Sequence, residues 1–211
     1  MTDNITVFKH NSIRIDAENG PIYVDPFEMD EAPHDAAFIL ITHDHYDHFS
    51  VKDIEKVACN NTVLVVPRKM VEKAREVEAL VAKIETVKPE ISKNIDGLML
   101  ETVPMYNIMK PFHPKTAEWV GYIVTVAGER IYIAGDIDAI KEAKEVKCDV
   151  ALVPVGGFYT MDARKAAGLV NAMQPKVAIP VHYGNLVGTS KDGEEFAKLV
   201  KEPIKAEIKI K

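Results

Sequence analysis

Three histidines and two aspartates lie among the six positions from His43 to His48, and only Thr42 separates this segment from the apolar run of residues 37–41. A continuous apolar run is typical of a strand covered on both faces, and side chains that follow its end share one pocket. His43, His45 and Asp47 alternate along the chain, so an extended backbone points them to one side, and His48 follows at the turn. Four imidazole or carboxylate groups this close would crowd one small ion but can be divided between two adjacent ions. The segment therefore predicts a metal site.

Further ligands for two ions are expected from other strand ends. Asp136 follows a predicted strand over residues 130–134, after a glycine that lets the backbone turn. His182 ends a predicted strand over residues 177–181, and His113 lies in the polar loop before Trp119. The two remaining histidines, His10 and His34, are expected at the surface.

Short strand patterns at the beginning of the chain give way to strand–helix alternation at its end. The early patterns are residues 5–8, 12–16, 22–24, 37–41 and 62–66, with helices expected over 50–58 and 70–81. More strands are expected between 84 and 103, a hairpin over 119–134, and alternating helices and strands up to a last strand at 206–210. The pattern predicts an α/β fold in which two sheets lie face to face with helices outside, a four-layer α/β/β/α sandwich. We expect one domain over residues 1–211.

Composition excludes several function classes. The chain has 211 residues, of which 47% are hydrophobic, so it can bury a sizeable core. Its net charge is −6 and no dense run of Lys or Arg is present, which argues against a nucleic-acid partner. Cys59 and Cys148 are too few for a disulfide framework or a thiolate metal site. No apolar run is long enough to span a membrane and no export signal is visible, so a cytoplasmic protein is expected. The oligomeric state stays open.

The segment from Thr42 to His48 resembles the His-x-His-x-Asp-His signature of the metallo-β-lactamase superfamily. His113, the Gly135-Asp136 pair and the His182-Tyr183 pair match the later motifs of that superfamily in order. The stretch from His113 through Trp119 to Asp136 looks most like the branch that contains ascorbate-phosphate lactonase and N-acyl-phosphatidylethanolamine phospholipase D. One departure is Ile137, where the family often has Thr or Ser.

The resemblance implies a binuclear metal-dependent hydrolase that uses a metal-bridging hydroxide. One ion would be held by His43, His45 and His113, the other by Asp47, His48 and His182, and Asp136 would bridge the two. Two divalent ions are expected, with zinc the first choice for imidazole and carboxylate ligands and manganese the second.

Asp47 and three further side chains are candidates for additional roles around the ions. Asp47 is expected to orient the hydroxide as well as bind, and Tyr183 could act as oxyanion donor or leaving-group acid. Asp25 and Asp44 are candidates for fixing the imidazole tautomers.

The substrate is expected to be a small, anionic ester, lactone or phosphodiester. Lys110 and Lys115 flank His113 and could hold an anionic group; the alternative is that both are solvated loop charges. A non-catalytic metal- or ligand-binding protein on the same fold is an alternative function. An iron-dependent oxidoreductase is disfavoured, because the flavodiiron branch has Glu where this chain has His45.

Overall fold

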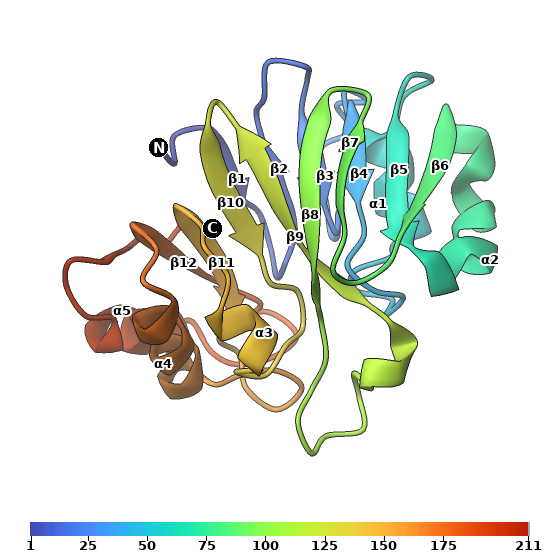
Figure 1. Cartoon of the computed structure of the whole chain (residues 1–211). Helices are drawn as coiled ribbons and strands as arrows, with labels where there is room; N and C mark the ends of the chain where they lie inside the picture. The colour runs from blue at the N-terminus through green and yellow to red at the C-terminus, as the bar shows by residue number, and fades with distance from the viewer. Residues whose placement is uncertain (211) are drawn as a thin grey trace.

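Two sheets face each other in the computed structural model, which describes residues 1–210 (Figure 1). The first sheet has six strands in chain order: β1 (Ile5–Val7), β2 (Ile13–Ile15), β3 (Ile22–Val24), β4 (Phe38–Leu40), β5 (Val63–Pro67) and β6 (Lys83–Val87). The second has seven strands in reverse chain order: β13 (Lys205–Ala206), β12 (Val177–Val181), β11 (Val150–Pro154), β10 (Glu129–Ile133), β9 (Val120–Val126), β8 (Leu98–Pro104) and β7 (Ser92–Ile95).

Each sheet is part antiparallel and part parallel. Strands β1 to β3 and strands β7 to β10 pair antiparallel, whereas β3 to β6 and β10 to β13 pair parallel. Helices connect the parallel strands, except β3 and β4, and lie outside the sheets (Figure 1). They are α1 (Val51–Val57), α2 (Val71–Ala74), α3 (Lys141–Lys144), α4 (Ala163–Met173) and α5 (Lys191–Leu199), with short 3-10 turns η1 (Arg68–Met70), η2 (Arg75–Leu80) and η3 (Lys115–Ala117). None of the helices in residues 1–210 is long and apolar enough to cross a membrane.

Strand β4 shows why these sequences form buried strands. Phe38 and Leu40 pack in the apolar core between the sheets, together with residues such as Val124 of the second sheet. Ile39 of the same strand points the other way and packs in a core that includes Ile54 of α1. An apolar run suits this strand because both of its faces are covered. The predicted α/β/β/α sandwich is confirmed.

Two predicted elements differ from those observed. The helix expected over residues 70–81 is α-helical only in α2 and continues as the 3-10 turn η2, although its buried residues Met70, Ala74 and Val77 keep helical spacing. The spacing therefore reports the buried face but not the hydrogen-bond pattern. The last strand is shorter than expected, because only Val177 and Ala178 of β12 pair with it.

Candidate metal centre

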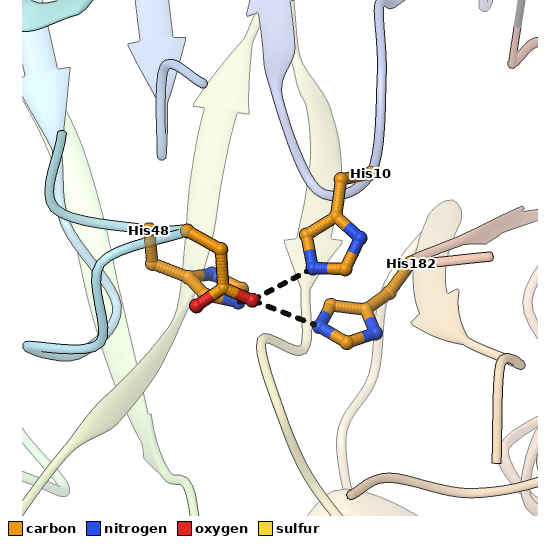
Figure 2. Close-up of side chains that lie close together, drawn as sticks. His10, His48 and His182 are labelled. Atoms are coloured by element: carbon orange, nitrogen blue, oxygen red, sulfur yellow. Dashed lines mark hydrogen bonds and ion pairs between the residues drawn. The ribbon is translucent and has the colours of Figure 1, made fainter. Parts of the chain in front are cut away.

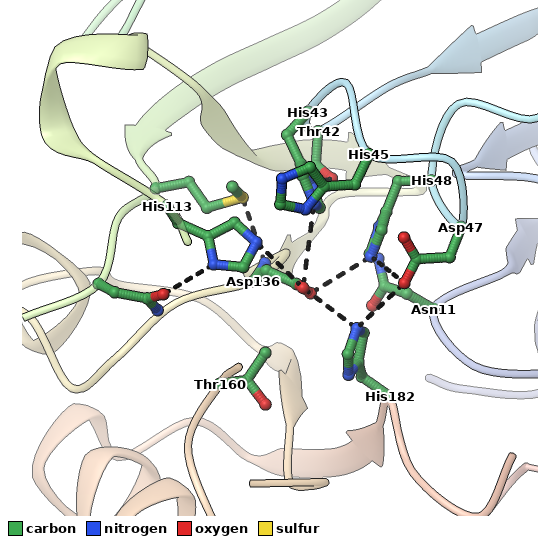
Figure 3. A network of polar contacts seen from close by, with 12 residues as sticks. Asn11, Thr42, His43, His45, Asp47, His48, His113, Asp136, Thr160 and His182 are labelled. Atoms are coloured by element: carbon green, nitrogen blue, oxygen red, sulfur yellow. Dashed lines mark hydrogen bonds and ion pairs between the residues drawn. The ribbon is translucent and has the colours of Figure 1, made fainter. Parts of the chain in front are cut away.

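Most histidines and aspartates of the predicted site lie just after the carboxyl ends of three strands, and one histidine lies in a loop. His43, His45, Asp47 and His48 lie shortly after β4. Asp136 follows β10, His182 follows β12, and His113 belongs to the loop between β8 and β9. The two sheets thus contribute to one centre, which Figure 3 shows from close by.

Three groups of candidate ligand atoms form in the described residues, and one of them joins Asp25 to His43 and His48 from behind the centre. The other two groups face the centre. His43, His45 and His113 place ligand atoms within 4.8 Å of one another. Asp47, His48 and His182 form a second group by the same criterion, which His10 joins. Each group is compact enough to surround one small ion.

Asp136 lies between the two groups. Its carboxylate oxygens are 3.3 Å from His113 Nε2, 3.4 Å from His48 Nε2 and 3.1 Å from His182 Nε2. The turn that directs it inward depends on Gly135, whose φ is +64° and whose Cβ, if present, would lie 2.6 Å from the Met105 sulfur. Glycine adopts this φ without strain, and a larger residue would have to displace the Met105 side chain.

Hydrogen bonds behind the imidazoles fix their orientation. Asp25 is fully buried and accepts from His48 Nδ1 at 2.7 Å and from the Thr42 hydroxyl at 2.6 Å. The same Thr42 oxygen accepts from His43 Nδ1 at 2.9 Å. His113 Nδ1 donates to the Asn107 side-chain carbonyl at 2.7 Å. With Nδ1 carrying the proton, each of these rings turns its Nε2 lone pair toward the centre.

Asp25 thus contacts an imidazole as expected, but Asp44 does not in the described part of the chain. The hydrogen bond found for Asp44 runs through its backbone carbonyl, which accepts from Lys73. Thr42 and Asn107 were not foreseen as partners, because a threonine at a strand end and a loop asparagine are common without any ligand nearby.

The pKa values of the histidines and aspartates in the centre depend on one another. Burial opposes ionisation of Asp136, but the neighbouring His182 and His48 outweigh it and hold the pKa of Asp136 well below its ordinary value. Burial likewise opposes protonation of His48, yet Asp136 and Asp25 raise its pKa well above the ordinary value. Burial and the nearby His48 lower the pKa of His43 well below its ordinary value. Ionised carboxylate and neutral imidazole are the forms that bind metal ions, so an ion bound at His48 would displace the proton that Asp136 and Asp25 favour there.

The centre has the unsatisfied polar atoms that a metal ion would complete. Among residues 1–210, His48 Nε2, His113 Nε2, both ring nitrogens of His182 and Asp136 Oδ1 are buried and make no hydrogen bond of suitable geometry, although the three Nε2 atoms lie 3.1–3.4 Å from the Asp136 carboxylate. Buried polar atoms are rarely left unpaired in proteins. Imidazole nitrogens and carboxylate oxygens that converge without partners fit divalent ions.

His10 is a member of this centre, and the expectation that it lies at the surface is wrong. The residue is fully buried in the turn between β1 and β2, where its Nε2 donates to Asp47 Oδ2 at 2.9 Å. Its ring lies beside that of His182 (Figure 2), with centroids 3.6 Å apart and the planes inclined by 42°. Its backbone carbonyl accepts from the His182 backbone N–H at 2.8 Å. Neither spacing nor hydrophobic pattern in the sequence indicated this contact. His34 is exposed, as expected.

The hydrogen bond from His10 supports the ionised form of Asp47. Burial raises the pKa of Asp47, but the bonds and charges of His10 and His48 outweigh it and lower the value to about 2. Burial lowers the pKa of His10 to about 4, against the pull of Asp47. A neutral His10 donor therefore faces an ionised Asp47 at neutral pH.

The remaining candidates, Lys110, Lys115 and Tyr183, direct their polar groups away from the metal-ligand candidates. The Lys110 ammonium is 2.6 Å from Asp138 and 2.7 Å from the Thr160 carbonyl, and that of Lys115 is 2.8 Å from Glu142. Tyr183 is buried against α5, where a Cβ on Gly193 would lie 2.3 Å from its hydroxyl. Burial raises the pKa of Tyr183 to about 12. The structure does not bring these three side chains together with the metal-ligand candidates.

Comparisons with known proteins agree with the fold and the site. A family model described as the β-lactamase superfamily domain matches residues 4–182. A UPF0173 metal-dependent hydrolase of Aeropyrum pernix is 33% identical over 221 residues, which cover 94% of this chain and 89% of that protein. Another from Pyrococcus abyssi is 31% identical and covers 82% and 78% of the two chains.

Solved structures show the same similarity. A metal-dependent hydrolase from Parabacteroides distasonis superposes with a TM-score of 0.81 at 32% identity, covering 97% of this chain and 91% of the other. A metallo hydrolase from Ignicoccus hospitalis has a TM-score of 0.77 at 20% identity over 97% and 94% of the chains, which shows the fold alone. The branch suggested by the stretch from His113 to Asp136 stays a prediction. The chain itself belongs to the metallo-β-lactamase superfamily and, within it, to the UPF0173 metal-dependent hydrolases.

Proposed function

We propose that this metal-dependent hydrolase is binuclear and cleaves a small ester, lactone or phosphodiester. The observation that carries the proposal is the position of Asp136, which is within 3.4 Å of His48 Nε2 in one ligand group and 3.3 Å of His113 Nε2 in the other. A carboxylate in that position can be shared by two ions, whereas a single ion would leave without a partner either the buried Nε2 of His113 or the buried Nε2 atoms of His48 and His182.

In this proposal His43, His45 and His113 hold one ion, Asp47, His48 and His182 hold the other, and Asp136 binds both. Two divalent ions held in this way would lower the pKa of a shared water and polarise the scissile carbonyl or phosphoryl group. The donor set of imidazoles and carboxylates suits zinc first and manganese second.

Residues around the ions would orient the attacking water and the imidazole ligands. Asp47 presents one oxygen to His10 and can direct the other toward the attacking water. Asp25 holds the His48 ring through its Nδ1 proton. Tyr183 has no part in the proposal, because its hydroxyl packs against α5.

The structure gives no support for the expectation that the substrate is anionic. Lys110 and Lys115 were the candidates for holding an anion, and both ammonium groups contact carboxylates of the chain. Ester, lactone and phosphodiester bonds all remain within the proposed reaction class.

The proposal is tested with His45→Ala and Asp136→Ala, compared with His34→Ala at the exposed histidine. Both site variants should keep the circular dichroism spectrum of the parent protein, bind less than two equivalents of metal and show no turnover on a panel of chromogenic esters, lactones and phosphodiesters. His34→Ala should behave like the parent. Turnover by the metal-free parent protein would refute the proposal, and tight metal binding without any turnover would favour a binding protein on the same fold.

A further inference from the structure

We propose that the site binds an uncharged, apolar group of its substrate beside the scissile bond, and therefore prefers neutral esters and lactones with an apolar acyl chain. This inference rests on the proposed function and goes beyond it by naming the class of substrate. It follows from what lines the cavity above the metal-ligand candidates.

The cavity has a volume of about 350 Å³ and reaches the centre directly. Five of its lining residues belong to the centre: His45, Asp47, His113, Asp136 and His182. The other five are apolar or aromatic and come from different loops: Tyr46, Phe112, Tyr159, Leu186 and Val187. A substrate whose reacting bond lies at the centre must place its neighbouring atoms against this second set.

An aromatic cluster forms one wall of the cavity. The ring centroids of Phe112 and Tyr159 are 4.7 Å apart, and Phe158 lies 5.8 Å from Phe112 and 4.7 Å from Tyr159. Phe158, which packs on Phe112 and Tyr159 at the rim and does not itself line the cavity, is 72% exposed, and the lining residue Tyr46 is 68% exposed. Large apolar side chains gathered in solvent around a reactive centre are typical of a ligand site. A bound apolar chain would cover them.

The charged side chains near the cavity also favour an uncharged group. The ten lining residues include no Lys or Arg. Lys110, the lysine next to the Phe112 segment, is engaged by Asp138 and the Thr160 carbonyl. A carboxylate or phosphate held against the apolar wall, away from the reacting bond, would lose hydration there with no Lys or Arg side chain to pair with. A methylene in the same place gains about fourfold in affinity on burial.

The test compares hydroxamates, because a hydroxamate binds divalent ions with the same head group whatever chain it carries. Hexanohydroxamate and adipic monohydroxamate have equal chain length and differ in a terminal methyl against a terminal carboxylate, and acetohydroxamate has no chain to reach the wall. We expect the zinc-loaded protein to bind hexanohydroxamate at least about tenfold more tightly than either of the others by isothermal titration calorimetry. Equal affinities, or tighter binding of the adipic compound, would overturn the inference.

Two variants locate the preference. Phe112→Ala should weaken hexanohydroxamate binding several-fold and leave acetohydroxamate binding unchanged. Met99→Ala is the matched control, because Met99 is an exposed apolar residue of β8 that does not line the cavity. An unchanged hexanohydroxamate affinity in Phe112→Ala would contradict the assignment of this wall.

Turnover separates this inference from the proposed function. Phenyl hexanoate should be hydrolysed with at least about tenfold higher kcat/KM than the phenyl monoester of adipic acid. If hexanohydroxamate is preferred but no ester, lactone or phosphodiester is cleaved, the proposed function fails and the apolar subsite stands. If both phenyl esters are cleaved at equal rates, the proposed function stands and the apolar subsite fails.

Discussion

Replacement of His10 should weaken the binding of one metal ion and leave the other unaffected. The Nε2 of His10 donates to Asp47 Oδ2 at 2.9 Å, and both side chains are largely shielded from solvent. A hydrogen bond to an ionised group contributes about 1.5–3 kcal/mol. His10→Ala removes this bond and the ring that packs on His182. We therefore expect about 10–100-fold weaker binding at the group of Asp47, His48 and His182, in line with other losses of a ligand's outer partner.

The assay is a competition titration of the metal-free protein with zinc in the presence of a chromophoric chelator, which resolves two binding steps. The step assigned to His43, His45 and His113 should be unchanged in His10→Ala. His10→Gln should recover most of the affinity, because the Gln amide can donate to Asp47 from nearly the same position. His34→Ala, at the exposed histidine, is the control for loss of an imidazole.

Three results would refute this reasoning. Unchanged binding of both ions in His10→Ala would mean that the bond to Asp47 is dispensable. Equal weakening of both steps would point to a general disturbance of the fold. A His10→Gln variant as weak as His10→Ala would mean that His10 is itself a metal ligand and does not act through Asp47.

Three other predictions concern the surroundings of the centre. Asp25→Asn should weaken binding of the ion at His48 by about 10–100-fold, measured in the same titration, because Asp25 holds the Nδ1 proton of that ring. Asp53→Asn should lower the free energy of unfolding by about 1–3 kcal/mol at pH 7 in urea denaturation, because buried Asp53 accepts two backbone N–H groups at 3.0 Å. Burial raises the pKa of Asp53, but its hydrogen bonds outweigh burial and lower the pKa below its ordinary value. The stabilisation that Asp53 provides is therefore present at pH values above the pKa of the unfolded chain. The difference in unfolding free energy between the parent and Asp53→Asn should shrink as pH falls below about 4. Lys115→Ala should leave KM for neutral and anionic esters unchanged, because Lys115 contacts Glu142; a raised KM for anionic esters alone would restore its role in binding an anion.

Local sequence patterns predict the part of the site that one strand end carries. His43 to His48 follow β4 directly, so the buried strand and the alternation of its polar continuation are enough to group them. Asp136 and His182 could be added because each also follows a strand, and parallel strands bring their carboxyl ends to one edge of a sheet.

Contacts between distant turns cannot be predicted in this way. His10 lies in the turn between two short antiparallel strands, β1 and β2, and it contacts Asp47 at the same end of the first sheet. It contacts His182 only because the second sheet closes over the centre. Lys110 and Lys115 show the opposite case, in which closeness in sequence does not lead to a contact in the fold. They are close to His113 in sequence, yet the fold offers each a nearer carboxylate, Asp138 and Glu142.

The most direct test of the binuclear centre is the metal content per chain. The protein would be purified without chelator and without a metal-affinity column, and measured by elemental analysis before and after reconstitution with zinc or manganese. The arrangement of the two ligand groups around Asp136 predicts about two equivalents of divalent ion per chain. One equivalent or less that reconstitution does not raise would contradict the binuclear centre and the mechanism built on it.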